Sequence, residues 1–242
     1  MTLQVRLIDG FELRVDGSPI ELPPSAQRLV AYIGLSGRPV LRPRVAGILW
    51  LETSDRQALG NLRSVLWRLR RSGLALIETA GEQLSLRSDV HVDVRRHMQL
   101  ARQLTSGSGV PDMAVLELEQ GGELLPDWYD DWVLVERERY RQLRLHALER
   151  LCVELTTAGS YARAVDVGLL AVAEEPLRES GHRALIKVHL AEGNVGEALR
   201  QYRAYTRAIH DELGLEPSRQ MDELVRGIRP TTGLASVRHH VR

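Results

Sequence analysis

The segment NLRSVLWRLRR, residues 61–71, has the clearest chemical potential, because it holds four arginines, one tryptophan and no acidic residue. A helix turns by about 100° per residue, so a helix over this segment separates apolar from cationic side chains. One face of this helix is apolar, and the opposite face carries guanidinium groups with no carboxylate to neutralise them. Such a face is either solvated or binds a polyanion. The apolar residues share roughly a third of the circumference and predict the buried face; they are Leu59, Leu62, Val65, Leu66 and Leu69.

Motifs of enzymes and cofactor sites do not occur in the sequence. It contains no HExxH, GxGxxG or GxSxG, and its only lysine, Lys187, lies outside any GxxxxGK[ST] phosphate loop. The single cysteine, Cys152, lies in a helical apolar pattern and is expected to be a buried thiol. His182 and His189 lie seven residues apart in one predicted helix, and we interpret them as packing residues. We therefore expect no catalytic residue, no metal site and no cofactor.

Composition and charge indicate an ordinary globular protein with two unlike parts. The 242 residues are 43% hydrophobic and 26% charged, which is typical of soluble domains. No apolar run is long enough for a membrane span and no signal peptide is apparent, so we expect a cytoplasmic, nucleoid-associated protein with no membrane partner. Residues 1–90 hold 12 arginines against 9 acidic residues, whereas residues 91–242 hold 20 basic against 23 acidic residues. The excess of positive charge lies in the first part, which favours a nucleic-acid partner there.

The first ninety residues predict a small sheet, three helices and a hairpin. Period-two alternation in LQVRLI and FELRV predicts two strands around a tight turn at Asp9-Gly10, followed by a short strand from Ile20 to Leu22. Helix-breaking and helix-capping residues then predict three helices. The first runs from Pro23-Pro24-Ser25 to Gly37, the second covers 42–50, and the third is capped by Ser54 and Gln57 and stops at Gly73. Strands over 74–79 and 83–87 are predicted to form a hairpin after them.

Three helices followed by a two-stranded hairpin is the order of a winged helix-turn-helix, whose third helix enters the major groove. The planar guanidinium of Arg68 can donate two hydrogen bonds to the acceptors of guanine, O6 and N7. Ser64 lies one turn earlier on the same face. Trp67 packs either on sugar-phosphate or on the hairpin. Phosphate contacts are expected from Arg63, Arg70 and Arg71, with Arg42, Arg44 and Arg87 as weaker candidates.

The remaining residues predict helices and an internal repeat. AGSYARAV and EGNVGEAL align at an offset of 34 residues, the tetratricopeptide period, which matches Gly159 to Gly193 and Ala164 to Ala198. Pro176 follows the first copy where that pattern ends its second helix, and the second copy has no proline at the matching place. Stacked helix pairs of this kind usually bind protein.

Three further segments have simpler interpretations. A helix is predicted over 92–104, and the breaker cluster at 105–112 predicts a flexible loop. A long helix is predicted over 130–157, after the cluster DWYDDW. Trp128, Tyr129 and Trp132 in this cluster either bind a ligand or anchor the helix, and we favour anchoring. Residues 229–242 lack periodicity and predict a disordered basic tail.

The whole pattern resembles the Streptomyces antibiotic regulatory protein (SARP) family, short activators that join an OmpR-type winged helix to a bacterial transcriptional activator domain (BTAD). The resemblance covers residues 1 to about 228 and rests on four stretches: FELRVDGSPIELPPSAQRLVAYI, NLRSVLWRLRR, LLPDWYDDWVLVERERYRQLRLHALE and AEGNVGEALRQYRAYTRAIHDELGLEPS. It implies a mainly α fold with a small β part. The implied domains are a winged helix over 1–91, a tetratricopeptide-like domain over 92–228 and a tail over 229–242.

The resemblance also implies a function. Members activate transcription by binding direct repeats of double-stranded DNA upstream of biosynthetic promoters, with self-association on the DNA and recruitment of RNA polymerase holoenzyme. By the family pattern, Ser64 and Arg68 meet base edges, and Arg70 and Arg71 contact phosphates. The connector of Glu52, Thr53, Ser54 and Asp55 occupies the place where OmpR-type activators touch polymerase. Larger members append an ATPase and sensor region, and we expect no control by nucleotide or phosphorylation within this chain.

A second interpretation is a tetratricopeptide-type adaptor that binds proteins and has no specific affinity for DNA. Its N-terminal unit would then be another protein-binding surface. Salt-sensitive binding to duplex DNA separates the two interpretations, because an adaptor lacks it.

Overall fold

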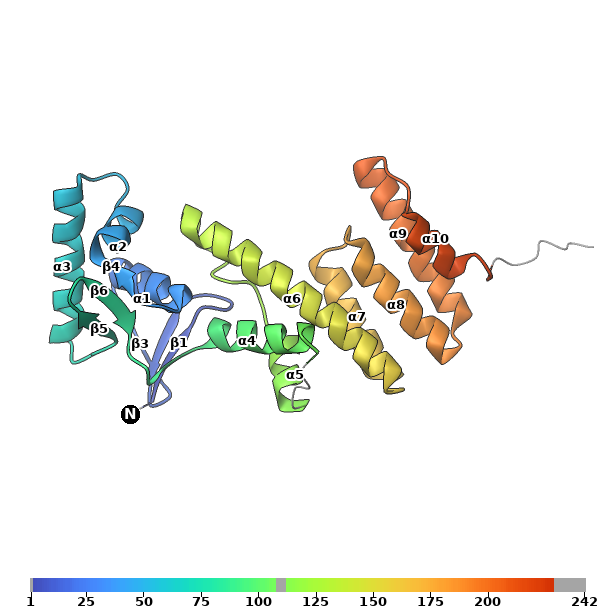
Figure 1. The fold of residues 1–242 in the computed structure, drawn as a ribbon, viewed down its shortest axis with the longest axis horizontal. Helices are drawn as coiled ribbons and strands as arrows, with labels where there is room; N and C mark the ends of the chain where they lie inside the picture. Colours follow the sequence, from blue (N-terminus) through green and yellow to red (C-terminus); the bar gives the residue numbers. More distant parts are fainter. Residues whose placement is uncertain (1, 108–111, 229–242) are drawn as a thin grey trace, which may run out of the picture. The chain divides into compact units, whose positions relative to one another are not determined.

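The structure is a computed structural model that describes residues 2–107 and 112–228 (Figure 1). The chain forms two compact units, Met1–Ala147 and Leu148–Arg242. The predicted tail and the centre of the predicted loop at 105–112 lie outside the described residues. The functional boundary between residues 91 and 92 stays a prediction, and the first compact unit extends well past it. No helix in the described ranges has the length and apolar character to cross a membrane.

A four-stranded sheet begins the first unit, with the strand order β3-β2-β1-β7. The strands β1 (Leu3–Arg6), β2 (Glu12–Val15) and β3 (Ser18–Ile20) pair antiparallel, and β7 (Val90–Val92) pairs parallel with β1. Alternate residues of β1 are fully buried, as the period-two pattern predicts. The three-residue strand β7 gives too short a pattern to be recognised in the sequence.

The predicted tight turn at Asp9-Gly10 is wrong. The register pairs Arg6 with Glu12, so a wider loop joins β1 to β2. The chain still turns at Asp9 and Gly10, both of which have positive φ, but it does so within this wider loop. The Asp9 N–H donates to the Glu123 carbonyl at 2.8 Å and Ile8 forms a β-bridge with Leu124, so the loop also pairs with a distant segment. The two-residue turn lies at Asp16-Gly17, where both residues have positive φ. The third strand consequently begins at Ser18, two residues before the prediction.

Three helices and a second sheet complete the winged helix-turn-helix. The helices α1 (Pro24–Ser36), α2 (Arg42–Leu49) and α3 (Asp55–Arg71) confirm the predicted order. Gly37 ends α1 and Gly73 follows α3, both with the left-handed φ that glycine permits. The wing hairpin of β5 (Ile77–Ala80) and β6 (Gln83–Leu86) is joined by β4 (Val40–Leu41), in the order β4-β6-β5.

The helices α4 (Asp93–Thr105) and α5 (Asp112–Glu119) continue the first unit. The Asp93 carboxylate accepts hydrogen bonds from the backbone N–H groups of Leu7 and Ile8, at 2.9 and 3.1 Å, which fixes the start of α4 to the end of β1. Arg95 on α4 donates to the carbonyls of Ile33 and Gly34 at the end of α1. These bonds explain why the first compact unit includes α4.

The long helix α6 (Asp131–Thr157) confirms the prediction of a helix after the aromatic cluster. Trp128 stacks on Phe11 with ring centroids 6.1 Å apart, and Trp132 meets Tyr32 edge-on at 5.3 Å. Both indoles therefore anchor the start of α6, Trp128 to the loop between β1 and β2 and Trp132 to α1, whereas Tyr129 is exposed.

The second unit contains α7 (Tyr161–Glu174), α8 (Glu179–Glu192), α9 (Val195–Leu213) and α10 (Arg219–Val225). The repeat is visible in its geometry, because Gly159 and Gly193 both have positive φ and Ala164 and Ala198 are both fully buried. Gly168 allows a close approach, since a Cβ there would lie 3.1 Å from Leu185. The fold is therefore mainly helical, with a winged helix followed by tetratricopeptide-like helices.

Candidate nucleic-acid interface

The apolar face of α3 fixes which side chains reach solvent. Ala58, Leu62, Val65, Leu66 and Leu69 are all buried in the core of the first unit. Leu59, which the sequence places on the buried face, is half-buried. The helix begins at a capping box in which the Ser54 N–H donates to Oε1 of Gln57 at 3.4 Å.

The outer face of α3 keeps its positive charge. Within residues 2–107 and 112–228, no carboxylate pairs with the arginines of the segment 61–71, which are Arg63, Arg68, Arg70 and Arg71. All four side chains are exposed. A solvated face and a polyanion-binding face both have this property, but a face neutralised by ion pairs does not.

Two contacts order part of this face. The guanidinium of Arg71 lies over the Trp67 ring, 5.0 Å from its centroid, in a cation–π arrangement. The Trp67 side chain is 58% exposed, so it does not pack away under the hairpin. The Nη2 of Arg70 donates to Oγ1 of Thr79 at 3.0 Å and so joins α3 to the first strand of the wing. A neutral hydroxyl leaves the charge of Arg70 uncompensated.

The hydroxyl of Ser64 is directed by the helix backbone. Its Oγ donates to the Gly60 carbonyl at 3.0 Å, which leaves its lone pairs facing solvent. Ser64 is therefore prepared to accept a hydrogen bond from a base edge, such as the amino group of adenine or cytosine.

The weaker candidates lie in three different settings. Arg42 starts α2, and its N–H donates to the Glu82 carbonyl at the wing turn. Arg44 is exposed and lines a separate hollow with Arg139 of α6. Arg87, directly after β6, is held by Asp89, with Nε to Oδ1 at 2.9 Å. The hydrogen bond to Asp89 raises the pKa of Arg87 and lowers that of Asp89, so this arginine is neutralised locally.

The connector between α2 and α3 is exposed along its whole length. Both the N–H and the Oγ1 of Thr53 donate to the Trp50 carbonyl, at 3.2 and 3.0 Å, and Ser54 caps α3. Glu52 and Asp55 present carboxylates to solvent at either end. Leu51, which the sequence analysis did not single out, is 73% exposed and adds an apolar contact surface.

His182 and Cys152 are both buried in the second unit. His182 is buried, with Nε2 2.8 Å from the Pro176 carbonyl and Nδ1 2.7 Å from Nε2 of Gln201. Burial raises the pKa of the Cys152 thiol to about 11. No group of three or more histidine, cysteine or carboxylate side chains is arranged to hold a metal ion in the described part of the chain.

Comparison with protein families identifies the helical part. Residues 78–229, more than half of the chain, match the sequence model of the bacterial transcriptional activator domain. The chain belongs to this family. In this chain the domain follows a winged helix, which is the order of domains that the sequence predicts from its resemblance to the SARP family.

Two relatives and one solved structure are similar to the chain. The regulatory proteins AfsR of Streptomyces coelicolor and Streptomyces griseus are each 28% identical to the chain, over 86% and 91% of its length. The chain spans 22% and 23% of those two proteins. The structure of Mycobacterium tuberculosis EmbR in complex with a low-affinity phosphopeptide has a TM-score of 0.71 at 20% identity, covering 93% of this chain and 64% of that one. This similarity concerns the fold.

Proposed function

We propose that the chain is a sequence-specific, DNA-binding activator that binds direct repeats upstream of biosynthetic promoters and recruits RNA polymerase holoenzyme. One observation carries the proposal: the outer face of α3 presents four arginines that no carboxylate neutralises within the described residues. Family membership supports a role in transcription. The width of the major groove, about 12 Å, admits one helix such as α3.

In this proposal, α3 reads bases and the flanking arginines hold the backbone. Arg68 contacts guanine, and the Ser64 hydroxyl accepts a hydrogen bond from an amino group of a base in the major groove. Arg63, Arg70, Arg71 and the Trp67 ring contact the sugar-phosphate backbone on either side of the base-reading residues. Arg42 and Arg44 contact phosphates farther along the backbone. Phosphate contacts fix the register of the helix, and base contacts supply the discrimination.

Direct repeats require head-to-tail neighbours on the DNA. Such neighbours use two different surfaces of the protein, in contrast to the two-fold symmetric dimers that read palindromes. The tetratricopeptide-like helices supply the surface for self-association on DNA. The connector Glu52–Asp55 contacts polymerase, because it is exposed, carries two carboxylates and lies next to the exposed apolar Leu51.

Binding to specific and scrambled duplexes tests the DNA part of the proposal. The specific duplex is taken from the intergenic region that footprinting with the protein protects. Arg68→Ala is expected to cost about 1–3 kcal/mol and to relax preference at one base position. Arg70→Ala is expected to weaken binding to both duplexes alike.

Two controls separate these effects from loss of structure. Thr79→Val removes the hydroxyl to which Arg70 donates but keeps the arginine, so it is expected to change DNA affinity less than Arg70→Ala. Arg102→Ala removes an exposed arginine from α4 and is expected to have no effect on preference. Equal losses for Arg68→Ala and Arg70→Ala on both duplexes would contradict the division between base and phosphate contacts.

The alternative function is a protein-binding adaptor without specific DNA affinity. The paired helices α7 to α10 favour it, because such repeats present surfaces for protein. Absence of salt-sensitive binding to any duplex would support the adaptor and overturn the activator.

A further inference from the structure

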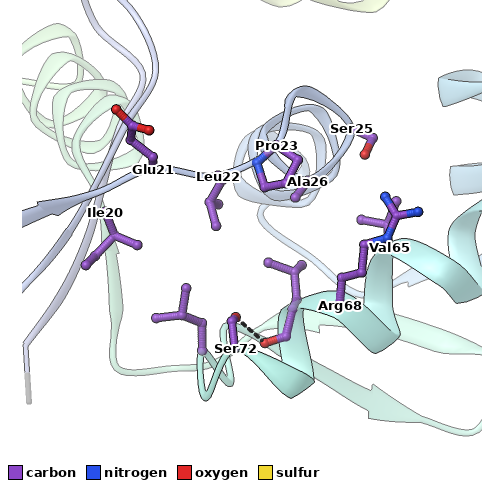
Figure 2. Close-up of a pocket in the computed structure, with 11 residues that line it drawn as sticks. Ile20, Glu21, Leu22, Pro23, Ser25, Ala26, Val65, Arg68 and Ser72 are labelled. Atoms are coloured by element: carbon purple, nitrogen blue, oxygen red, sulfur yellow. Dashed lines mark hydrogen bonds between the residues drawn. The ribbon is translucent and has the colours of Figure 1, made fainter.

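A cleft of about 300 Å³ lies between the C-terminal half of α3 and the segment that joins β3 to α1 (Figure 2). Its walls are mostly apolar, and four of the side chains that line it are buried in the core of the first unit: Leu22, Ala26, Val65 and Leu69. Ile20 and Leu74 complete the apolar lining and are half-buried. The cleft therefore offers a preformed apolar surface next to the proposed DNA-reading helix.

The polar groups of the cleft are few and unlike one another. Arg68 lines it from α3, and no carboxylate pairs with this guanidinium in the described ranges. The Ser72 hydroxyl donates to the Leu69 carbonyl at 2.9 Å, so its proton is already used (Figure 2). The carboxylate of Glu21 is turned away from the apolar walls (Figure 2). One free cation beside an apolar hollow is the pattern of a site for an amphipathic anion.

The first turn of α1 adds to the positive potential. Pro23 provides no side-chain cap, and the turn contains no acidic residue. Ser25 and Ala26 of this turn line the cleft. The positive end of the α1 dipole is thus not compensated locally, and it favours a negative group in the same hollow as Arg68.

We propose that this cleft binds a small amphipathic carboxylate, whose apolar part lies against Leu22, Val65 and Leu69 and whose carboxylate pairs with Arg68. The proposal has a regulatory consequence that rests on the proposed function. Because Arg68 is the residue assigned to base reading, a bound acid occupies the guanidinium that the DNA needs. The acid and specific DNA therefore compete for Arg68.

The volume sets the size of the acid. A cavity of about 150 Å³ holds benzene, with six carbon atoms. By the same proportion, a cleft of about 300 Å³ holds roughly twelve non-hydrogen atoms. Decanoate has that number and is a suitable probe, whereas 1-decanol provides the same chain without the charge.

Calorimetric titration of the full chain with each probe, well below the micelle concentration of decanoate, tests the site. We expect one decanoate per chain and at least tenfold weaker binding of 1-decanol. Arg68→Gln is expected to abolish the difference between the two probes while leaving the binding of 1-decanol unchanged. Binding to many weak sites, or equal affinity for acid and alcohol in the unsubstituted chain, would overturn the proposal.

Filling the cleft provides a second test that keeps Arg68. Leu74→Trp from one side and Ile20→Trp from the other are each expected to lower decanoate affinity at least tenfold. Leu213→Trp places the same ring on an exposed position of α9 and is the matched control. Circular dichroism and urea midpoints identify a variant that does not fold, and the other cleft variant then decides. Unchanged decanoate binding in a folded cleft variant would contradict the assigned site.

Competition is measured by titrating decanoate into a complex of the protein with the footprinted duplex. We expect decanoate, and not 1-decanol, to displace the DNA. Displacement is expected to be lost in Leu74→Trp. Decanoate binding without displacement would overturn the regulatory consequence, and decanoate binding by a protein with no DNA affinity would overturn the proposed function instead.

Discussion

The ion pair between Arg87 and Asp89 makes a quantitative prediction about DNA binding. Arg87 lies directly after the wing strand β6, and its Nη2 lies 2.5 Å from Oδ2 of Asp89. In the unsubstituted chain, Asp89 pairs with this arginine, so we expect Arg87 to release no counterion from DNA. Asp89→Asn removes the carboxylate and so frees one additional cation beside the wing.

The phosphate contacts proposed above set the size of the effect. Five arginines that no carboxylate neutralises in the described ranges are assigned to phosphates, and each contact contributes about −0.9 to the slope of log affinity against log salt. The unsubstituted chain is therefore expected to show a slope of about −4.5, equivalent to a fall of about 500-fold between roughly 50 and 200 mM salt. A sixth contact in Asp89→Asn makes the slope about −5.4. The five are Arg42, Arg44, Arg63, Arg70 and Arg71.

Fluorescence anisotropy with a labelled duplex over a series of salt concentrations measures these slopes. Glu117→Gln is the matched control, because it frees Arg96 on α4 from an exposed ion pair and raises the net charge by the same amount. Arg87→Ala is expected to leave the slope of the unsubstituted chain unchanged. It is also expected to cancel the gain when combined with Asp89→Asn.

Three results would refute this reasoning. A slope shallower than about −2 for the unsubstituted chain means that most of the assigned phosphate contacts are absent. Equal steepening by Asp89→Asn and Glu117→Gln means that net charge, and not position beside the wing, controls affinity. A loss in Arg87→Ala means that Arg87 contacts DNA while still paired.

Two further predictions concern stability. Asp93→Ala leaves the backbone N–H groups of Leu7 and Ile8 without their acceptor and is expected to lower the free energy of unfolding by about 2–4 kcal/mol. Urea denaturation measures this free energy. Asp127→Ala is the control, for which a change within about 0.5 kcal/mol is expected. A similarly small change for Asp93→Ala would contradict the role of the Asp93 carboxylate. Burial lowers the pKa of His182 in the folded protein below its ordinary value of 6.5. The neutral ring therefore stabilises the fold at a pH above 6.5, and this stability is lost as the pH falls through the lower pKa of the folded protein. Urea midpoints at about pH 7.5 and 5.5 are expected to differ less in His182→Gln than in the unsubstituted chain, and an equal difference would be evidence against this source of acid sensitivity.

Local patterns were sufficient to predict the elements with strong signals. The apolar spacing of α3, its capping box, and the glycines that end α1 and α3 each act within a few residues of chain. The repeat could be found for the same reason, since Gly159 and Gly193 perform one conformational role at the same place in two helix pairs. These signals depend on the backbone near the residue and not on distant partners.

Long-range pairing accounts for what the sequence did not reveal. The sequence Asp9-Gly10 has the composition of a tight turn, but the loop there is wider and its backbone is hydrogen-bonded to Glu123. The strands β4 and β7 have two and three residues, and they are strands only because β6 and β1 lie beside them. The cleft beside Arg68 was missed likewise, because its walls come from two segments, 20–26 and 65–74, that are far apart in the sequence. No single stretch of sequence contains such a site.

Arginine content alone is a poor guide to the interface, because several arginines of the first unit serve the fold. Arg137 and Arg144 donate to the backbone carbonyls of Leu124 and Leu118, and burial lowers the pKa of Arg144. Arg28 pairs with Asp130, and Arg95 is directed at the end of α1. Each of these guanidinium groups donates to a carbonyl or carboxylate of the fold. The four arginines of the segment 61–71 differ, because residues 2–107 and 112–228 give them no carbonyl or carboxylate acceptor. A phosphate backbone is the ligand that would supply many acceptors at once.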